Sequence, residues 1–412
     1  MSKLQIPSQS LVAVAGDAPA EIVEEIRNLL SAEPIFWDIN NPTVAKAGLI
    51  AELREKGRAI ALLPRYHDAA LRDLARIAKG RGSVPVAIID EPGQAQLHFD
   101  NVGGFKSVFE GVPMPNDRRA DEGPFDIIGD VHGCAREFMT LLERLGYADN
   151  GWEDAGPADW RAYIRPHAAG RKAVLLGDLV DRGPHNYASL LIARQLVRFG
   201  GYFAIGNHDD KVARWLMGRD VVMKGAIVET AKELSNLSVA HRTELGRWIL
   251  SNERHYMLDQ GRLVVAHAGL AEHLHGRRTK EADAFATYGL TDPDAPNDPD
   301  GYPARIDWAH DYSGDAFVVH GHVVYDDVRI KNRVISIDTG CVFGGKLTSL
   351  QWPEQVITSV DAEKAYVEGR FASASEALSP NRWKRLRQLI PRRINHDPCA
   401  HWRSPMDMMR HG

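Results

Sequence analysis

Five short apolar runs in this chain end in polar residues beside glycine, and the first of these runs constrains the fold most. It is the run 125–128, which leads into Gly129-Asp130-Val131-His132-Gly133. Residues two positions apart on a strand point to the same face, so Asp130 and His132 can converge on one point. The flanking glycines let the backbone turn and let a ligand approach. The apolar residues that follow recur at helical spacing, which predicts a strand, a loop and a helix.

Four further apolar runs repeat this arrangement. Each is weak by itself, because a glycine-aspartate pair is usually a turn and a histidine after a strand is usually a buried core residue. Open α/β sheets bind ligands at the carboxyl ends of their strands, so the recurrence predicts one polar rim. The runs and their polar segments are 173–176 with Gly177-Asp178, Asp181 and Arg182; 202–205 with Gly206-Asn207-His208-Asp209; 263–266 with His267-Ala268-Gly269; and 316–319 with His320-Gly321-His322.

The candidate ligands on this rim are carboxylates, imidazoles and an amide oxygen, without a thiolate. Such groups suit a first-row divalent ion such as Mn²⁺, Fe²⁺ or Zn²⁺ rather than a structural zinc or a calcium cage. They exceed what one catalytic ion can use while keeping an open position, so two ions that share a carboxylate fit better. Two ions about 3.5–4 Å apart generate hydroxide at neutral pH and clamp the oxygens of an in-line displacement. The predicted reaction is phosphoester hydrolysis.

The first hundred residues alternate apolar runs with segments of helical period, which predicts βαβ units on a parallel sheet. The turn after the first run contains Asp17 and Glu21, which would repel a triphosphate, and the chain has no P-loop motif. We therefore predict a scaffold or docking domain without ATP chemistry. The predicted strands are 11–15, 35–39, 59–63 and 84–89, and the predicted helices are 20–30, 43–56 and 68–79.

Changes in composition divide the chain into three predicted parts. Residues 1–112 form the α/β domain, 113–358 carry the polar rim, and 359–412 form a helical, basic C-terminal tail. Within the tail we predict one polar helix over 361–378 and a basic amphipathic segment over 381–393. A segment of that kind contacts RNA, an anionic surface or an acidic partner, or else packs its apolar stripe on its own protein.

The overall composition indicates which partners and which cellular compartment to expect. The net charge of −5 gives no general attraction to nucleic acid, so any such binding requires a local patch. Cys134, Cys341 and Cys399 lie far apart without a CxxC pair, which argues for a reducing compartment. No apolar run reaches the roughly 18 residues of a membrane span, and the N-terminus lacks a signal-peptide pattern. We expect a cytoplasmic protein without a transmembrane segment, and the sequence leaves its oligomeric state open.

Taken in order, the five motifs resemble those of the calcineurin-like metallophosphoesterases. Three further segments look closest to the phosphatase domain of bacterial polynucleotide kinase-phosphatase. They look more distantly like lambda-type protein phosphatases and diadenosine tetraphosphatases. The resemblance spans about residues 116–353 and implies an α/β fold with a β-sandwich flanked by helices. The three segments are 117–119 followed by GPFDIIGDVHGC, 305–309 (RIDWA) and 337–348 (IDTGCVFGGKLT).

Carried over position by position, the resemblance implies a two-metal centre. The ions are expected to be Mn²⁺ foremost, with Fe, Zn or Ni as alternatives, and Asp178 is expected to bridge them. His320 is expected beside the ligands rather than among them, because the family usually has an apolar or small residue there. The implied ligands are Asp130, His132 and Asp178 for the first ion, and Asp178, Asn207, His267 and His322 for the second.

The resemblance also implies roles for five residues that do not bind metal. Arg182 resembles the arginine that grips the phosphate, a role suited to a bidentate guanidinium. His208 resembles the residue that protonates the leaving oxygen, and Asp181 is positioned to hold its imidazole. Asp338 resembles a carboxylate that supports the ligands from behind. Arg305 is expected to be a second phosphate clamp or part of a structural ion pair.

A weaker resemblance reaches the first domain. Arg72, Leu74, Ala75 and the strand 85–89 resemble the later half of the kinase domain that precedes the phosphatase in that family. We therefore expect a smaller, doubly wound α/β domain that resembles a degenerate P-loop kinase.

Several functions remain open at this stage. The leading hypothesis is a phosphatase acting on phosphorylated RNA or DNA ends or on nucleotides, including 2′,3′-cyclic phosphates. The alternatives are a protein serine/threonine phosphatase, a dinucleoside polyphosphate hydrolase, or an RNA- or partner-binding module with secondary catalysis.

Overall fold

A computed structural model describes most of the chain, and its residues fall into two compact units. The units are Met1–Asp117 with Gly276–Asp283, and Arg118–His275 with Ala284–Gly412. Asp17 in the first predicted turn and the basic segment 381–393 lie outside the described residues. The described residues are 4–16, 20–39, 41–65, 67–90, 109–292, 296, 304–369 and 371–372.

A four-stranded parallel sheet in the order β3-β4-β2-β5 forms the centre of the first unit. Helix α1 places Ile22, Ile26 and Leu30 against one face, because residues four apart share one side of a helix. Helices α2 and α3 pack Leu49 and Leu74 against the other face. A parallel pair, β1 and β6, completes the unit. Its elements are β1 (Leu4–Pro7), β2 (Ser10–Gly16), α1 (Ala20–Leu30), β3 (Pro34–Phe36), α2 (Thr43–Lys56), β4 (Ala59–Leu63), α3 (Asp68–Gly80), β5 (Val84–Asp90) and β6 (Phe109–Val112).

The alternation of strands and helices predicted for this unit is confirmed over the described residues. The third element differs, since β3 ends at Phe36 and not at residue 39. It ends early because only Pro34–Phe36 pair with β4.

Two five-stranded sheets form the second unit, in the orders β16-β15-β7-β8-β9 and β10-β11-β12-β14-β13. The strands are β7 (Phe125–Ile128), β8 (Lys172–Leu175), β9 (Tyr202–Phe203), β10 (His255–Leu258), β11 (Leu263–Ala266), β12 (Phe317–His320), β13 (Arg329–Lys331), β14 (Val334–Ser336), β15 (Lys346–Trp352) and β16 (Val356–Asp361).

The two sheets are joined by one apolar core. Alternate residues of β7, such as Phe125 and Ile127, share that core with Val265 of β11 and Val319 of β12. Successive side chains of a strand point to opposite faces, so these alternate residues enter the same core although β7 is buried on both faces. A mixed α/β fold with a β-sandwich is therefore present.

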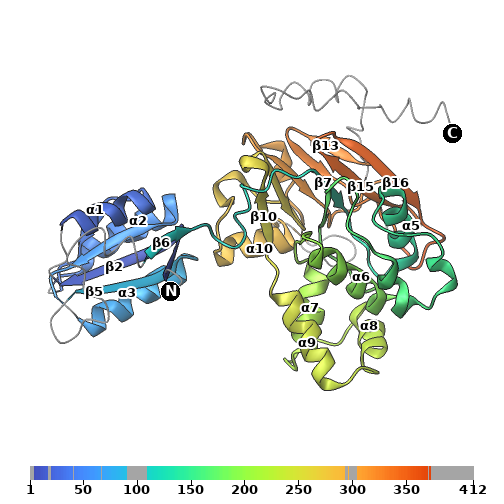
Figure 1. Ribbon diagram of the computed structural model, residues 1–412, viewed down its shortest axis with the longest axis horizontal. Coiled ribbons are helices and arrows are strands. Elements are labelled where there is room, and N and C mark those ends of the chain that lie inside the picture. The colour runs from blue at the N-terminus through green and yellow to red at the C-terminus, as the bar shows by residue number, and fades with distance from the viewer. Residues whose placement is uncertain are drawn as a thin grey trace. The chain divides into compact units, whose positions relative to one another are not determined.

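Helices cover the outer face of the β7 sheet. Phe138 and Leu142 of α5 pack there together with Leu190 of α6 and Ile128 of β7. Figure 1 shows these helices, in green, beside the orange strands of the same unit. The helices are α5 (Ala135–Leu145), α6 (Asn186–Arg198), α7 (Asn207–Leu216), α8 (Ile227–Leu234), α9 (Val239–Leu250) and α10 (Lys280–Tyr288), whose first residues belong to the first unit. The 3₁₀ helices are η1 (Trp152–Asp154), η2 (Pro157–Tyr163), η3 (Asp259–Gly261), η4 (Glu272–Leu274) and η5 (Trp308–His310).

The helix predicted over 361–378 is wrong where the structure describes it. Strand β16 runs to Asp361 and so crosses the boundary predicted at residue 358. The residues after it form bends, with Ala362 N–H donating to Gly345 O and Tyr366 N–H to Val342 O. These backbone groups bond to a distant loop and not to residues four positions earlier, so a helix cannot form. Residues 373–412 lie outside the described residues.

Among the described residues, no helix combines the length and apolar character that crossing a bilayer demands.

Candidate active site

The predicted polar rim lies at the carboxyl ends of parallel strands from both sheets. Strands β7, β8 and β9 run parallel in one sheet, and β11, β12 and β14 run parallel in the other. Each of these strands is followed within a few residues by a candidate site residue. In strand order these are Asp130 with His132, Asp178, Asn207, His267, His322 and Asp338.

Four of these side chains converge around Nε2 of His267. This nitrogen lies 3.0 Å from Asn207 Oδ1, 3.0 Å from His322 Nδ1 and 3.4 Å from Asp178 Oδ2. His267 Nδ1 lies 2.9 Å from the Leu176 carbonyl oxygen, to which it donates its hydrogen. With that hydrogen on Nδ1, four lone-pair atoms face one another, and a cation is the species that satisfies all of them.

Asp178 also lies beside a second group on its other side. Its Oδ2 is 3.5 Å from His132 Nε2 and 4.0 Å from His208 Nε2. His132 Nδ1 lies 3.0 Å from the Val180 carbonyl and donates to it, so His132 also turns Nε2 toward the centre. Asp178 is therefore the one carboxylate shared by both groups. Two sets of side chains that both contain Asp178 have ligand atoms close enough to share one ion, His132 with Asp178 and His208, and Asp178 with His267 and His322.

Because glycine has no side chain, two glycines make room for the carboxylates of Asp130 and Asp178. A Cβ at Gly321 would lie 1.8 Å from Asp130 Oδ1, and a Cβ at Gly206 would lie 2.2 Å from Asp178 Oδ1. No side chain fits at either position unless the carboxylate moves. Glycine is therefore required in the GNHD and HGH segments, because a carboxylate lies too close to the backbone for any side chain.

Several site residues adopt a positive backbone φ angle, which residues with a side chain rarely adopt. The φ angle is 45° at His132, 46° at Asp178, 75° at Asp181, 74° at Arg182 and 67° at His322. Positive φ is uncommon for residues other than glycine, and such strain clusters at functional sites. Here it turns the side chains inward at three of the strand ends.

The electrostatics of the buried groups favour a cation among them. Burial raises the pKa of Asp130 well above its usual range, and the nearby Asp338 and Asp178 charges raise it further. Burial also acts to raise the pKa of Asp178, but His267 and His208 outweigh it and hold that pKa well below the usual value. Burial lowers the pKa of His267, yet Asp178 outweighs burial and raises it. Crowded carboxylates of this kind are stabilised by a cation at their centre.

The same residues fit divalent metal ions. Asp130 Oδ1 is buried and has no hydrogen-bond partner among the described residues, whereas Asp130 Oδ2 accepts from the His322 N–H at 3.0 Å. Burial lowers the pKa of both His132 and His322 well below the usual value, which keeps these imidazoles in the neutral, ligating form. A free carboxylate oxygen beside neutral imidazoles is an oxygen and nitrogen donor set suited to first-row divalent ions.

Next to the convergent groups, His208 and Asp181 form a hydrogen-bonded pair. His208 Nδ1 lies 2.6 Å from Asp181 Oδ2, which fixes the imidazole and leaves its Nε2 turned toward Asp178. The main chain of His208 is held as well, because its N–H donates to Asp178 Oδ1 at 3.0 Å. This is the geometry of an imidazole oriented by a carboxylate.

Helix α8 anchors this pair, and sequence reasoning missed the contribution. The Thr230 hydroxyl donates to Asp181 Oδ1, so both carboxylate oxygens of Asp181 are engaged. Glu233 of α8 accepts from the N–H groups of Asn186 and Tyr187 at the start of α6, and Asn186 Oδ1 accepts from the Asp181 N–H. Thr230 lies 49 residues from Asp181 along the chain, and no local pattern marks it.

Asp209 was also missed as a structural residue, although it belongs to the GNHD segment. Its buried carboxylate accepts from the Leu179 N–H at 2.9 Å and from the Gly206 N–H at 3.0 Å. It therefore ties the loop after β8 to the loop after β9. Burial and the Asp178 charge raise the pKa of Asp209 to about 7.

The other predicted residues surround the convergent groups. An Arg182 guanidinium nitrogen lies 2.7 Å from His132 Nε2, and the guanidinium carbon lies 5.2 Å from the Phe343 ring centroid. Asp338 is buried after β14 and accepts from the Gly340 N–H at 3.1 Å. Arg305 is exposed, and its charge contributes to the lowered pKa of His322 after burial and His267.

His320 lies apart from the convergent atoms described above. Its ring packs 5.7 Å from the Trp308 ring, centroid to centroid. Trp308 in turn fits over Gly269, where a Cβ would lie 2.0 Å from the indole. The glycine of the HAG segment thus admits the tryptophan of the RIDWA segment.

Comparisons with known proteins place this site in a family. The sequence pattern described as calcineurin-like phosphoesterase matches residues 123–326. The asymmetrical bis(5′-nucleosyl)-tetraphosphatase PrpE of Geobacillus sp. (strain WCH70) is 39% identical over 251 residues, which cover 60% of this chain and 97% of that protein. PrpE of Geobacillus thermodenitrificans (strain NG80-2) is 38% identical and covers 61% of this chain, with 99% of its own length matched.

A solved structure assigned as a diadenosine tetraphosphatase is also similar, at 24% identity and a TM-score of 0.43, covering 60% of this chain and 96% of that one.

The fold, the site and these relatives define a class of enzyme, the metal-dependent hydrolases of phosphoesters. Within that class, the chain belongs to the calcineurin-like phosphoesterase family.

Proposed function

We propose that this protein is a two-metal hydrolase of dinucleoside polyphosphates. The observation that carries the proposal is the match to PrpE of Geobacillus sp., an asymmetrical bis(5′-nucleosyl)-tetraphosphatase whose length is matched almost completely, at 97%. Such a reaction adds water across one phosphoanhydride bond of a dinucleoside tetraphosphate. Asymmetric cleavage yields a nucleoside triphosphate and a nucleoside monophosphate.

In this proposal Asp130, His132 and Asp178 hold one ion, and Asp178 reaches the second. Asn207, His267 and His322 complete the second set. The preferred ion is Mn²⁺, because oxygen and nitrogen donors without thiolate suit it. A divalent pair supplies Lewis acidity, which lowers the pKa of water and stabilises negative charge on phosphoryl oxygens.

The chain's own residues perform the remaining steps. Arg182 binds a phosphoryl oxygen through its guanidinium fork, which the Phe343 ring helps to orient. His208 delivers a proton from Nε2 to the oxygen that leaves, and Asp181 holds the imidazole at Nδ1. Asp338 supports the ligands electrostatically, and Arg305 adds a second positive charge for the phosphate chain.

A second candidate substrate is a phosphorylated nucleic-acid end. It is favoured by the segments that resemble polynucleotide kinase-phosphatase, among them 305–309 and 337–348. In that case the first unit would be a kinase-derived docking domain without ATP chemistry, and the basic segment 381–393 would help to hold RNA.

A substrate panel distinguishes these functions. We expect the Mn²⁺-loaded protein to hydrolyse diadenosine tetraphosphate with a kcat/KM at least about tenfold above that for an RNA 3′-phosphate, an RNA 2′,3′-cyclic phosphate or a phosphopeptide. Nucleotide products separated by ion-exchange chromatography would show ATP and AMP if cleavage is asymmetric. A preference for the RNA ends would reject the dinucleoside assignment in favour of the second candidate.

Thr230→Val is expected to lower kcat about five- to tenfold for a phosphomonoester with an alcohol leaving group. Valine keeps the shape of threonine but cannot donate to Asp181, so the carboxylate that orients His208 becomes free to rotate. With p-nitrophenyl phosphate, whose leaving group departs without a proton, the loss should be below about twofold. KM should stay unchanged for both substrates.

Thr230→Ser is the matched control, because serine restores the hydroxyl donor and should recover most of the rate. An equal loss of kcat on both substrates would show that Thr230 acts on stability or metal binding instead.

A further inference from the structure

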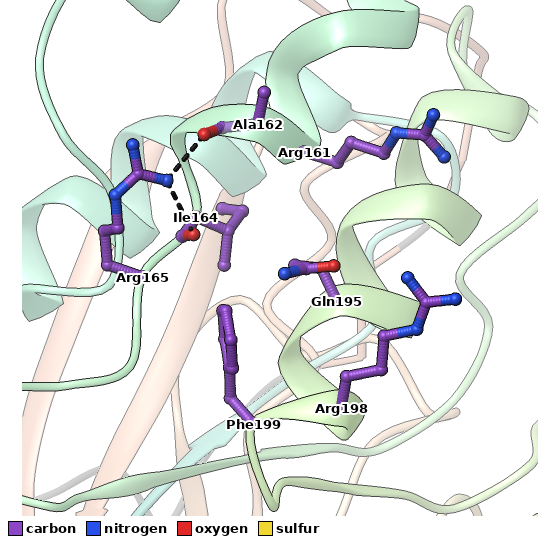
Figure 2. Close-up of a pocket in the computed structure, with 7 residues that line it drawn as sticks. All are labelled: Arg161, Ala162, Ile164, Arg165, Gln195, Arg198 and Phe199. Carbon is purple, nitrogen blue, oxygen red and sulfur yellow. Dashed lines mark hydrogen bonds between the residues drawn. The ribbon is translucent and has the colours of Figure 1, made fainter.

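A cavity of about 340 Å³ lies at the far end of α6 from the polar rim. Helix α6 begins at Asn186 beside the Asp181 loop and has 13 residues, which makes it about 20 Å long. The cavity is formed where the end of α6 meets η2 and the two residues after it, as Figure 2 shows. The lining residues are Arg161, Ala162, Ile164, Arg165, Gln195, Arg198 and Phe199.

Three arginines line this cavity, and none of the lining residues is acidic. One of them, Arg165, is already engaged. Its Nε lies 2.9 Å from Asp149 Oδ2, and a terminal nitrogen donates to the carbonyl oxygens of Ala162 and Ile164, drawn as dashed lines in Figure 2. Arg165 therefore shapes the wall and contributes little free positive charge.

The other two arginines are exposed. No ion pair of Arg161 or Arg198 occurs within the part of the chain that the structure describes, although the charge of Arg198 contributes, after Arg194 and His241, to the lowered pKa of Glu244. Figure 2 shows both side chains extending toward the right of the view, with the Gln195 amide to the left of the two guanidinium groups. Guanidinium groups bind phosphate oxygens through paired hydrogen bonds, so two exposed arginines at one cavity suit a phosphate ligand.

The opposite wall is apolar. Phe199 is 38% exposed although it is an aromatic residue, and it lies below Ile164, which is buried. An accessible aromatic face beside exposed arginines offers a stacking surface for a flat, hydrophobic ring.

We propose that this cavity is a second nucleotide-binding site, distinct from the catalytic centre. The phosphates lie between Arg161 and Arg198, and the base stacks on Phe199 within reach of the Gln195 amide. The volume of about 340 Å³ falls within the range of roughly 300–1,000 Å³ that small-molecule sites occupy. A mononucleotide is the proposed occupant, because the cavity offers one exposed aromatic ring for one base and two exposed arginines for its phosphates.

The test is calorimetric titration of ADP into the full-length protein in the presence of EDTA, which prevents hydrolysis. We expect the double variant Arg161→Gln/Arg198→Gln to weaken ADP binding at least about tenfold, because both charge-assisted contacts are lost. The same variant should retain its Mn²⁺-dependent kcat/KM for p-nitrophenyl phosphate. Arg182→Gln, in the catalytic centre, should leave the ADP affinity within about twofold of wild type.

Phe199→Ser tests the base contact separately. It should weaken ADP binding at least about fivefold and leave pyrophosphate binding unchanged, since a base stacked on an aromatic ring contributes a sizeable part of the affinity. Unchanged ADP binding in the double arginine variant would overturn the proposal, and so would equal affinities for ADP and pyrophosphate. An oligoribonucleotide that binds more than about tenfold tighter than ADP through Arg161 and Arg198 would replace the nucleotide by RNA.

Discussion

Asp178→Asn is expected to lower kcat for every phosphoester substrate by at least about a thousandfold. Asp178 is the carboxylate that both groups of candidate ligands share, at 3.4 Å from His267 Nε2 and 3.5 Å from His132 Nε2. Removing its charge weakens the binding of both ions together, and their Lewis acidity would lower the barrier by several kcal/mol. Inductively coupled plasma mass spectrometry should find fewer than two ions per chain in the variant.

The substitution Asp178→Asn should not unfold the protein. Asparagine keeps an acceptor oxygen for the His208 N–H and tolerates the φ of 46° at this position. Circular dichroism and the unfolding temperature should therefore change little, which separates loss of metal from loss of fold.

Arg305→Ala is the control variant for Asp178→Asn, because it also removes a charge near the site. Arg305 is exposed, so its loss should act mainly through KM and leave the ions bound. If Asp178→Asn and Arg305→Ala both retain near-normal turnover, the proposed ligand set is incorrect.

His208→Ala is expected to lower kcat by about 10²- to 10⁴-fold when the leaving group is an alcohol, the usual range for general acid catalysis. Its Nε2 is the atom turned toward the site, because Nδ1 is held by Asp181 at 2.6 Å. An alkoxide leaves poorly without a proton, whereas p-nitrophenolate leaves readily. The loss with p-nitrophenyl phosphate should therefore be much smaller.

Two measurements keep this prediction specific. The metal content of His208→Ala should match that of the wild-type protein, since His208 is proposed as a proton donor and not as a ligand. Asp181→Asn should show the same dependence on the leaving group to a lesser degree. An equal loss on both kinds of substrate, or a fall from two ions to one, would assign His208 to metal binding or structure.

The residues of the candidate site could be found from the sequence because the signal is local. Each chemical group follows an apolar run of strand length, and glycine beside it marks a turn or a close approach, as at Gly206 and Gly321. The sequence also shows that the candidate ligands are carboxylates, imidazoles and an amide, without a thiolate. These ligand types determine the kind of ion that the site suits.

The pairing of distant segments was not visible in the sequence. The helix predicted over 361–378 failed because β16 pairs with β15 up to Asp361, and the following backbone groups bond to residues 342–345. A polar stretch of helical composition carries no mark of a partner strand elsewhere in the chain. Tertiary context overrides such a propensity, because a weak preference per residue is smaller than the gain from extending a sheet.

What the sequence determined by itself is which atoms are present at each strand end, since strand, turn and ligand lie within a few consecutive residues. What only the tertiary structure decided is that these ends meet. Two sheets had to pack through one core for His267 and His322 to come within reach of Asp178 and Asn207. Thr230 in α8 and the pair Arg161 and Arg198 acquire their surroundings in the same way, from elements far apart in the chain. Periodicity in a sequence reports the burial of one face of one element, and the partner of that face depends on how the whole chain packs.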